Sequence, residues 1–261
     1  MYSFEKPIGI GAPKKIFTLP LLIYHGMELT YLYHSGFALE GNGLTLIVDY
    51  WRDSVPATAE KLLERPVKRY VLASHFHPDH FNPEVLRWQE KHADIVYIFS
   101  KDILKRRKAT ANAAHYLRKG EIYSDGMLRI EAFGSTDVGV SLLIEAEGKK
   151  IFHAGDLNNW RWEAESTEAE IRKAEGDFLK ELEDLARSVK RLDVAMFPVD
   201  PRQGGDYMRG ARQLLDRIPT EIFIPMHFWE DYRSAAAFAP YAASKGTRFI
   251  ALTHEGQQIT I

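Results

Sequence analysis

The sequence contains no cysteine among its 261 residues. This absence excludes disulfide bonds, thiolate metal ligands and a cysteine nucleophile, so any bound metal must be held by nitrogen and oxygen atoms. A large excess of one charge is also absent, because 34 lysines and arginines nearly balance 36 aspartates and glutamates. We therefore expect no general electrostatic attraction to nucleic acid or to an anionic membrane.

Long hydrophobic runs are absent as well, and no segment approaches the roughly 18 apolar residues of a membrane span. The longest run near the start, residues 16–24, contains Pro20 and no small-residue cleavage site, so we interpret it as a strand and not as a secretion signal. No linker rich in glycine, serine or proline divides the chain. We expect one cytoplasmic domain over residues 1–261, with residues 1–26 as a candidate N-terminal extension; the oligomeric state is not indicated.

Short apolar or alternating segments recur along the chain with helix-forming segments between them. Strands are predicted at residues 29–33, 44–48, 69–73, 95–99, 128–132, 140–145, 149–153, 193–199, 221–226 and 248–252. Helices are predicted at residues 57–64, 83–91, 101–110, within 163–190, at 207–217 and at 234–245. This alternation predicts an α/β fold in which helices lie outside two sheets.

The strongest chemical signal follows the predicted strand at 69–73. The segment His75-Phe76-His77-Pro78-Asp79-His80 holds three histidines and one aspartate. Residues two apart point the same way in an extended chain, so His75 and His77 can bind one cation, and a turn at Pro78 can direct Asp79 and His80 toward a second. Imidazole and carboxylate ligands suit zinc, and also iron or manganese. The segment therefore predicts a site for two metal ions, with zinc the first candidate.

This segment matches the His-x-His-x-Asp-His signature of the metallo-β-lactamase superfamily, which the sequence resembles over residues 27–261, most closely in its lactonase-like branch. The segment 47–49 resembles the early strand of that family that ends in an aspartate. The segment 152–156 resembles the later strand whose aspartate bridges two metals, and His227 stands where the last histidine ligand follows a strand. The resemblance implies a four-layered αββα sandwich.

The resemblance also implies which residues bind which metal. His75 and His77 would serve the first site, Asp79, His80 and His227 the second, and Asp156 would bridge the two.

One departure from the family pattern affects the first site. The family usually supplies a third histidine from a loop that corresponds here to residues 134–139, which contain no histidine. We favour Asp137 as its replacement. His153 or His115, or a weak or empty first site, are the alternatives.

Aromatic and basic residues near the proposed ligands are candidates for contact with a substrate. His34 resembles a residue of the early pocket segment in the lactonase-like branch. Trp160 and Arg161 follow Asp156 closely, and Trp229 follows His227. Arg202 can bind an anionic group of a substrate through two nitrogens, although a salt bridge is the more common role of such an arginine.

Taken together, these features predict a hydrolase in which a metal-activated hydroxide attacks an ester, lactone or phosphoester of a small molecule, with Asp79 as the catalytic residue that orients it. A nuclease or phosphodiesterase of the same superfamily is the first alternative, which the near-neutral charge disfavours. A di-iron relative that reduces oxygen would be expected to carry a carboxylate in place of His77. A metal-poor binding protein is the third alternative, which the missing loop histidine allows. The sequence does not identify the substrate.

Overall fold

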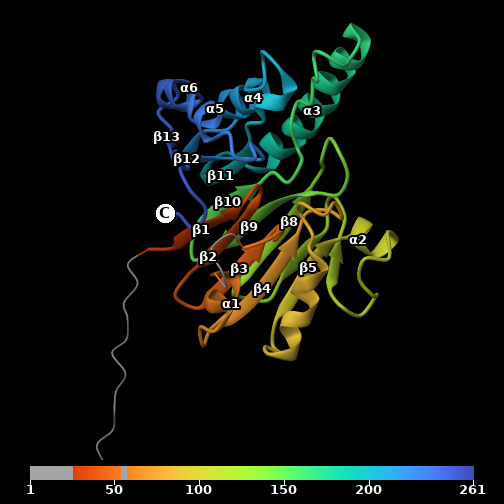
Figure 1. Ribbon diagram of the computed structural model, residues 1–261, viewed down its shortest axis with the longest axis vertical. Helices are drawn as coiled ribbons and strands as arrows, with labels where there is room; N and C mark the ends of the chain where they lie inside the picture. Colours follow the sequence, from red (N-terminus) through yellow and green to blue (C-terminus); the bar gives the residue numbers. More distant parts are fainter. Residues whose placement is uncertain (1–25, 54–57) are drawn as a thin grey trace, which may run out of the picture.

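The computed structural model describes residues 26–53 and 58–261, so the strand predicted at residues 16–24 lies outside the described part. The chain forms two sheets (Figure 1). The strands of the first sheet are β1 (Glu28–Tyr33), β2 (Gly36–Glu40), β3 (Leu44–Val48), β4 (Lys68–Ala73), β5 (Val96–Ser100), β6 (His115–Leu117) and β14 (Gln258–Thr260). The strands of the second sheet are β7 (Ile122–Ser124), β8 (Leu128–Phe133), β9 (Ser141–Ala146), β10 (Lys149–His153), β11 (Leu192–Pro198), β12 (Thr220–Met226) and β13 (Arg248–Phe249).

Both sheets mix parallel and antiparallel pairs. The first runs in the order β14-β1-β2-β3-β4-β5-β6 and is parallel from β3 to β6. The second runs in the order β13-β12-β11-β10-β9-β8-β7 and is parallel from β10 to β13. Parallel neighbours present their carboxyl ends at the same edge of a sheet, which is where ligands bind in many α/β proteins.

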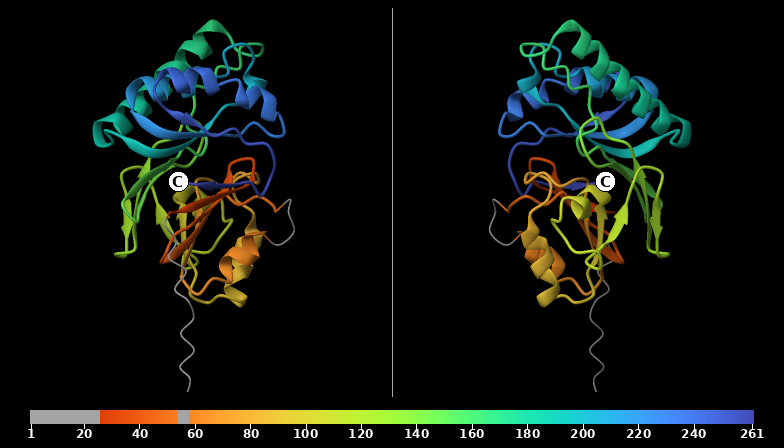
Figure 2. Two further views of the ribbon diagram at one scale, coloured as in Figure 1. Left: turned by 90° about the vertical axis from the view of Figure 1, so that its left-hand side faces the viewer. Right: turned by 90° about the vertical axis from the view of Figure 1, so that its right-hand side faces the viewer.

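Helices cover the outer face of each sheet. The helices beside the first sheet are α1 (Thr58–Leu63), the 3₁₀ helix η1 (Pro83–Glu90) and α2 (Lys101–Lys105). Those beside the second are α3 (Glu168–Ser188), the short 3₁₀ helix η2 (Pro201–Gln203), α4 (Arg209–Arg217), α5 (Tyr232–Ala236) and α6 (Ala239–Ser244). The views in Figure 2 show the two sheets stacked between these helical layers. The predicted αββα sandwich is therefore confirmed.

The alternation of side chains in β4 explains why this strand is buried on both faces. Tyr70 and Leu72 belong to the core between the two sheets, whereas Val71 and Ala73 belong to the core under α1, η1 and α2. Successive residues of a strand point to opposite faces, so the covered part of a central strand must be apolar on both faces. The charged residues Lys68 and Arg69 lie at the less buried start of β4, and the polar residues of the site follow its buried end, at Ser74 and beyond.

The predicted helices differ from the observed ones where the backbone has local constraints. The helix predicted at 101–110 ends at Lys105, because Arg107 takes a left-handed conformation with φ of 56°. The helix predicted at 234–245 is two short helices, α5 and α6. Pro240 lies in the first turn of α6, where its missing N–H costs nothing, but it could not continue a helix that began at Tyr232. Residues 83–90 form a 3₁₀ helix, and β2, β6, β7 and β14 were not predicted.

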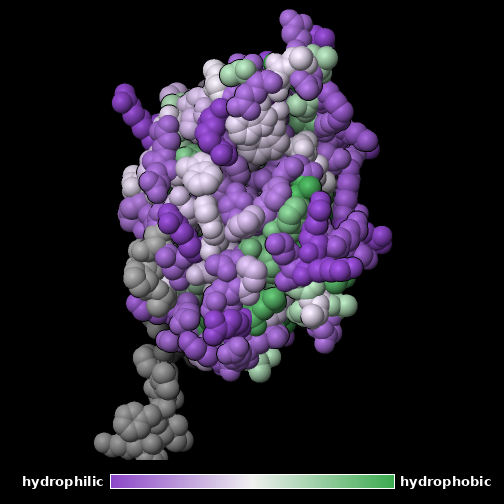
Figure 3. Space-filling model, turned by 45° about the vertical axis from the view of Figure 1, so that its right-hand side comes forward, coloured by the Kyte–Doolittle hydropathy of each residue, from purple (hydrophilic) through white to green (hydrophobic). Residues whose placement is uncertain are grey.

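Hydrophilic residues cover most of the face shown in Figure 3, and hydrophobic residues form only a narrow strip on it. Among the described residues, Ile122, Met127 and Trp229 are the large hydrophobic residues that are exposed. Within residues 26–53 and 58–261, no helix combines the length and the apolar character needed to cross a membrane.

Candidate metal centre

The structure gathers histidines and aspartates into two neighbouring groups. The first group consists of His75, His77, Asp137 and Asp156, and the second consists of His34, Asp79, His80 and His227. Within each group, one nitrogen or oxygen atom of every residue lies within 4.8 Å of the corresponding atoms of the others. All six residues that the family resemblance implies as ligands therefore lie in one place, together with Asp137 and His34.

The first group is partly open to solvent. His75 is fully buried, and its Nε2 lies 3.0 Å from Nδ1 of His77 and 3.4 Å from Oδ2 of Asp156. Nδ1 of His77 lies 3.3 Å from Oδ2 of Asp137, and these two side chains are 36% and 41% exposed. Asp137, which we favoured as the replacement for the missing histidine, thus lies in this group.

The two alternative histidines lie in neither group. Nε2 of His153 lies 2.8 Å from the backbone oxygen of Ser35, and the ring of His115 packs against Tyr123.

The second group is more deeply buried. Nε2 of His34 lies 3.3 Å from Oδ2 of Asp79, and Nε2 of His80 lies 3.8 Å from the same oxygen. The ring centroids of His34 and His227 are 4.2 Å apart. We expected His34 to line the substrate pocket, but its turn between β1 and β2 places it among the candidate ligands.

Asp156 lies between the two groups. Its Oδ2 faces His75 of the first group at 3.4 Å, whereas its Oδ1 faces His80 at 3.1 Å and His227 at 3.4 Å in the second group. Each oxygen of this carboxylate is thus directed at a different group. This arrangement is compatible with the bridging role that the resemblance implies.

Several buried atoms of the site make no well-formed hydrogen bond within the described part of the chain. They are both ring nitrogens of His34, Nε2 of His80 and Oδ1 of Asp156. Their nearest charged neighbours are other candidate ligands, because Nε2 of His34 lies 3.3 Å from Asp79 and Nε2 of His80 lies 3.1 Å from Oδ1 of Asp156. A buried polar atom without a hydrogen bond costs about 1–3 kcal/mol, so such atoms are rare unless something else satisfies them. A cation would satisfy one nitrogen of each histidine and the oxygen of Asp156, and the residues present therefore fit a metal.

Two buried carboxylates hold candidate ligands from behind. Asp49 accepts hydrogen bonds from the backbone nitrogen and hydroxyl of Ser74 at 2.7 and 2.6 Å, and its Oδ2 lies 2.7 Å from Nδ1 of His80. Oδ2 of Asp200 lies 2.9 Å from Nδ1 of His227. A carboxylate that accepts Nδ1–H fixes the ring orientation and leaves Nε2 free for a metal.

Burial and neighbouring charges set the protonation of the second group. Burial lowers the pKa of His34 to about 4, so its imidazole is neutral near pH 7. Burial would also lower the pKa of His80, but the carboxylates of Asp156 and Asp49 outweigh burial and raise it well above its ordinary value. Burial acts to raise the pKa of Asp79, yet the polar contact with His34 and the charge of His80 hold it well below the usual range. Without a cation, His80 therefore carries a proton that a metal would displace.

Backbone strain is concentrated around these groups. Five of the non-glycine residues with positive φ lie at the site, namely His34 at 57°, Asp49 at 49°, Trp162 at 42°, His227 at 63° and Trp229 at 57°. For bulky side chains this conformation is an outlier that persists only when the surroundings enforce it, and such outliers cluster at functional sites.

A cavity of about 340 Å³ opens beside the first group and is lined by Thr136, Asp137, Asp156, Trp160, Trp162 and His227. Trp160 donates from Nε1 to the backbone oxygen of Asp156 at 2.8 Å, and its ring stacks on Trp162 with centroids 5.7 Å apart. Trp160, which we predicted to contact substrate, thus forms a wall of this cavity.

The other predicted substrate contacts lie differently. Arg161 forms ion pairs with Glu163 and Glu175 and does not line the cavity. Arg202 pairs with Asp200, and Trp229 packs against His34 with ring centroids 5.0 Å apart.

Sequence reasoning missed two residues that support the site. Asp200 was not among the predicted site residues, and neither was Thr136, whose hydroxyl donates to the backbone oxygen of Asn158 at 2.6 Å. For Asp200 a signal existed. β10, β11 and β12 are parallel neighbours, and Asp156, Asp200 and His227 each follow the end of one of them.

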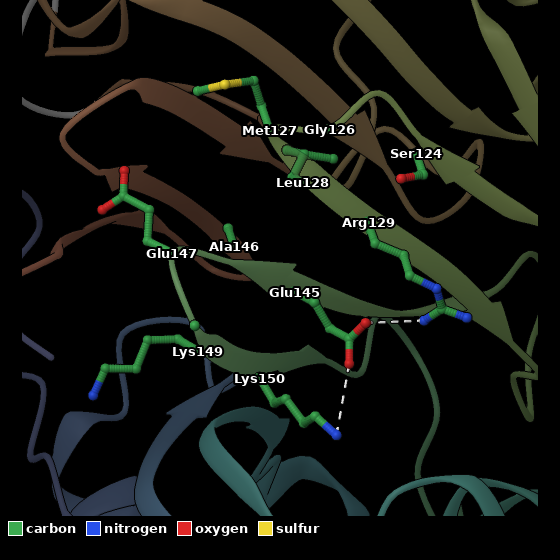
Figure 4. Close-up of a pocket in the computed structure, with 11 residues that line it drawn as sticks. Ser124, Gly126, Met127, Leu128, Arg129, Glu145, Ala146, Glu147, Lys149 and Lys150 are labelled. Atoms are coloured by element: carbon green, nitrogen blue, oxygen red, sulfur yellow. Dashed lines mark hydrogen bonds and ion pairs between the residues drawn. The ribbon is translucent and has the colours of Figure 1, made fainter.

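A second cavity, of about 400 Å³, lies at the far ends of β8, β9 and β10 (Figure 4). Its charged residues are largely paired with one another, because Glu145 binds Arg129 at 3.1 Å and Lys150 at 3.6 Å. None of the candidate ligands lines it. The smaller cavity beside Asp137 and Asp156 is therefore the better candidate for the substrate site.

Comparison with known proteins identifies the family of the chain. The family model described as a beta-lactamase superfamily domain matches residues 28–227. A UPF0173 metal-dependent hydrolase of Korarchaeum cryptofilum is 28% identical over 209 residues, which cover 77% of this chain and 83% of the relative. A UPF0173 metal-dependent hydrolase of Symbiobacterium thermophilum is 24% identical over 247 residues, covering 90% and 100%.

Solved structures show the same fold at low identity. Igni18, a metallo hydrolase from the archaeon Ignicoccus hospitalis, superposes with a TM-score of 0.62 at 19% identity, covering 90% of this chain and 98% of that one. CmlA, a diiron β-hydroxylase from Streptomyces venezuelae, gives 0.61 at 14% identity, covering 90% of this chain and 54% of that one.

These relatives do not single out the lactonase-like branch, which stays a prediction. The family model nevertheless spans most of the chain, including the segment His75 to His80 and every other candidate ligand. The chain therefore belongs to the metallo-β-lactamase superfamily, and metal-dependent hydrolases are among its homologues.

Proposed function

We propose that this metal-dependent hydrolase of the metallo-β-lactamase fold binds two zinc ions and cleaves an ester, lactone or phosphoester bond of a small molecule. The observation that carries the proposal is the pair of ligand groups with their unsatisfied buried nitrogen and oxygen atoms. Burying polar atoms without hydrogen bonds is costly, and a bound metal would offset this cost in a way that a metal-free protein could not.

Each of the two ligand groups would hold one zinc ion. One zinc would be held by His75, His77 and Asp137, the other by His34, Asp79, His80 and His227, with Asp156 shared. Bound metal ions of this kind lower the pKa of water to about 7 and polarise a carbonyl or phosphoryl oxygen.

Asp79 is the proposed catalytic residue because it combines charge with access. Its side chain is 25% exposed, whereas His34 and His80 beside it are fully buried. The polar contact with His34 and the charge of His80 overcome the effect of burial and hold the pKa of Asp79 well below its usual range. A carboxylate with so low a pKa is a weak base, so Asp79 acts mainly by accepting a hydrogen bond that orients water, and less by storing a proton.

The cavity favours a small and largely uncharged substrate. Its volume of about 340 Å³ lies at the lower end of the range of small-molecule sites. Its lining contains two tryptophans and neither lysine nor arginine among the described residues. A nuclease would need a basic surface along the phosphate backbone. We therefore place the small-molecule hydrolase ahead of the nuclease.

Zinc is the first choice of metal because the donors are imidazole nitrogens and carboxylate oxygens. Manganese and iron accept the same donors, and the diiron protein CmlA shares the fold. The expected cytoplasmic location and the small-molecule substrate are further parts of this proposal.

The test begins with metal content. Protein stripped with a chelator is titrated with zinc, manganese and ferrous iron, bound metal is measured by mass spectrometry, and each form is assayed against esters, lactones and phosphodiesters. The proposal expects two equivalents of metal and turnover that the chelator abolishes. A chain that binds no metal would be a binding protein, and oxygen consumption by the iron form without hydrolysis would favour redox chemistry.

A further inference from the structure

Asp200 joins an arginine to a candidate metal ligand. This carboxylate is fully buried directly after β11, and its Oδ2 lies 2.9 Å from Nδ1 of His227. The side chain of Arg202 holds the same carboxylate with two nitrogens, Nε at 2.9 Å from Oδ1 and Nη2 at 2.5 Å from Oδ2. The backbone nitrogen of Arg202 also donates to Oδ1 at 3.0 Å. Both oxygens of Asp200 are therefore fixed.

Arg202 is in turn held by aromatic rings. Its Cζ lies 5.6 Å from the ring centroid of Trp162 and 5.2 Å from that of Trp229. Trp162 stacks on Trp160 with an angle of 8° between the rings, and the ring of Trp160 meets His227 at 5.2 Å. The contacts thus form a closed ring that starts and ends at a candidate ligand, in the order His227, Asp200, Arg202, Trp162, Trp160.

Three members of this arrangement have a strained backbone. Trp162, His227 and Trp229 take positive φ angles of 42°, 63° and 57°. Strain of this kind costs on the order of 1–3 kcal/mol per residue and persists only where surrounding contacts determine the conformation. The ring of contacts supplies that constraint.

We propose that Arg202 is a positioning residue for His227, acting through Asp200, and that it does not bind an anionic group of the substrate. An arginine that captures a carboxylate or phosphate presents two nitrogens to its ligand. In Arg202, two of the three guanidinium nitrogens already bind Asp200, and the side chain does not line the cavity. The inference rests on the proposed function only in taking His227 as a metal ligand.

The geometry explains what Arg202 contributes. A buried carboxylate that loses a partner can rotate or take up a proton, and either change removes the acceptor that holds Nδ1–H of His227. The Nε2 lone pair would then no longer be held toward the cation that the second group would bind. Partners of this kind typically change metal affinity 10- to 100-fold. The guanidinium stacked on Trp162 also fixes the cavity wall relative to the ligand.

The variants R202Q and R202K test the proposal. Zinc affinity is measured by competition with a chromophoric chelator, and the tautomer of His227 in metal-free protein by two-dimensional ¹H–¹⁵N NMR of the imidazole. We expect R202Q to bind the zinc of the second group, which contains His227, roughly 10- to 100-fold less tightly, with loss of the single Nδ1–H tautomer of His227. R202K keeps the positive charge but loses the paired nitrogens that bind both oxygens of Asp200, so its zinc affinity should lie between those of R202Q and the parent.

Kinetics separate the two roles of an arginine. For a neutral ester, positioning predicts a lower kcat at saturating zinc with little change in KM. Unchanged zinc affinity and an unchanged tautomer, with KM raised only for substrates that carry a carboxylate or phosphate, would overturn the proposal. The matched control is R217Q, which removes a half-exposed arginine that pairs with Glu183 at 2.8 Å outside both ligand groups.

The readouts also separate this inference from the proposed function. If the parent protein binds no zinc, the proposed function fails, while the His227 tautomer in R202Q still decides whether Arg202 acts through Asp200. Urea unfolding of each variant establishes that it is folded. If R202Q does not fold, R202K provides the same comparison. An R202K protein with the parental His227 tautomer and the parental zinc affinity would refute the role of the two-nitrogen contact between Arg202 and Asp200.

Discussion

Replacing Asp137 with alanine should remove a metal ligand without harming the fold. The side chain is 41% exposed, and its ionic contact is with Nδ1 of His77 at 3.3 Å. Truncation of an exposed side chain of this kind changes the free energy of unfolding by less than about 0.5 kcal/mol. Loss of a charged partner costs the bound cation about 1.5–3 kcal/mol. Zinc affinity at the first site should therefore fall roughly 10- to 150-fold.

The assay combines zinc titration against a chromophoric chelator with urea unfolding of the metal-free protein. D137H restores the residue type that the family usually has in this loop, and we expect it to keep two equivalents of zinc. D177A is the matched control, because Asp177 is 55% exposed, pairs with Lys173 and belongs to neither ligand group. Two equivalents bound by D137A with parental affinity would show that Asp137 is not a ligand and would refute the reasoning.

Three further predictions concern the other candidate ligands and the carboxylate of Asp49 behind them. H77A and D79A should each abolish metal-dependent turnover while circular dichroism shows a folded protein, and full activity in either variant would contradict the assignment of the site. D49N should lower zinc affinity roughly 10- to 100-fold and destabilise the protein by about 1.5–3 kcal/mol in urea unfolding. Asp49 accepts with both oxygens, from the backbone nitrogen of Ser74 at Oδ1 and from the hydroxyl of Ser74 and Nδ1 of His80 at Oδ2, and an amide has only one acceptor oxygen. Equal stability would argue against an ionised Asp49. Zinc affinity should fall on acidification, because the neighbouring carboxylates raise the pKa of His80 and the metal must compete with a proton there. His34, with its pKa of about 4, needs no deprotonation near neutrality. Chelator titrations between about pH 6 and pH 8 that show no such trend would be inconsistent with His80 as a ligand.

The parts of the structure that could be predicted are those with a local signal. The strand Leu44–Val48 was predicted at its observed bounds, because an apolar run between turns is typical of a covered strand. The histidines after β4 were recognisable from their spacing alone. Their grouping with Asp137 in the structure follows the choice that the missing loop histidine had suggested.

The parts that could not be predicted depend on contacts between distant segments. His34 looks like an isolated turn residue in the sequence. It lies among the ligands because its left-handed turn places its backbone oxygen 3.2 Å from the backbone nitrogen of His227, almost two hundred residues later. Similarly, the role of Asp200 depends on His227, which follows a different strand, and local sequence patterns do not predict contacts between residues so far apart. The 3₁₀ form of residues 83–90 is also a tertiary outcome, since local propensity does not separate it from an α-helix.

The candidate ligands come from both sheets, which links metal binding to the stability of the folded protein. His34 and the segment His75 to His80 project from loops of the first sheet, whereas Asp137, Asp156 and His227 project from loops of the second. Each ion would therefore cross-link the two halves of the sandwich, and by mass action a ligand at a thousand times its Kd stabilises the native state by about 4 kcal/mol. A gain of that size is a large fraction of the free energy of unfolding of a typical domain, which is about 5–15 kcal/mol. A shortage of metal would then lower the amount of enzyme that escapes unfolding and proteolysis, as well as the activity of each molecule.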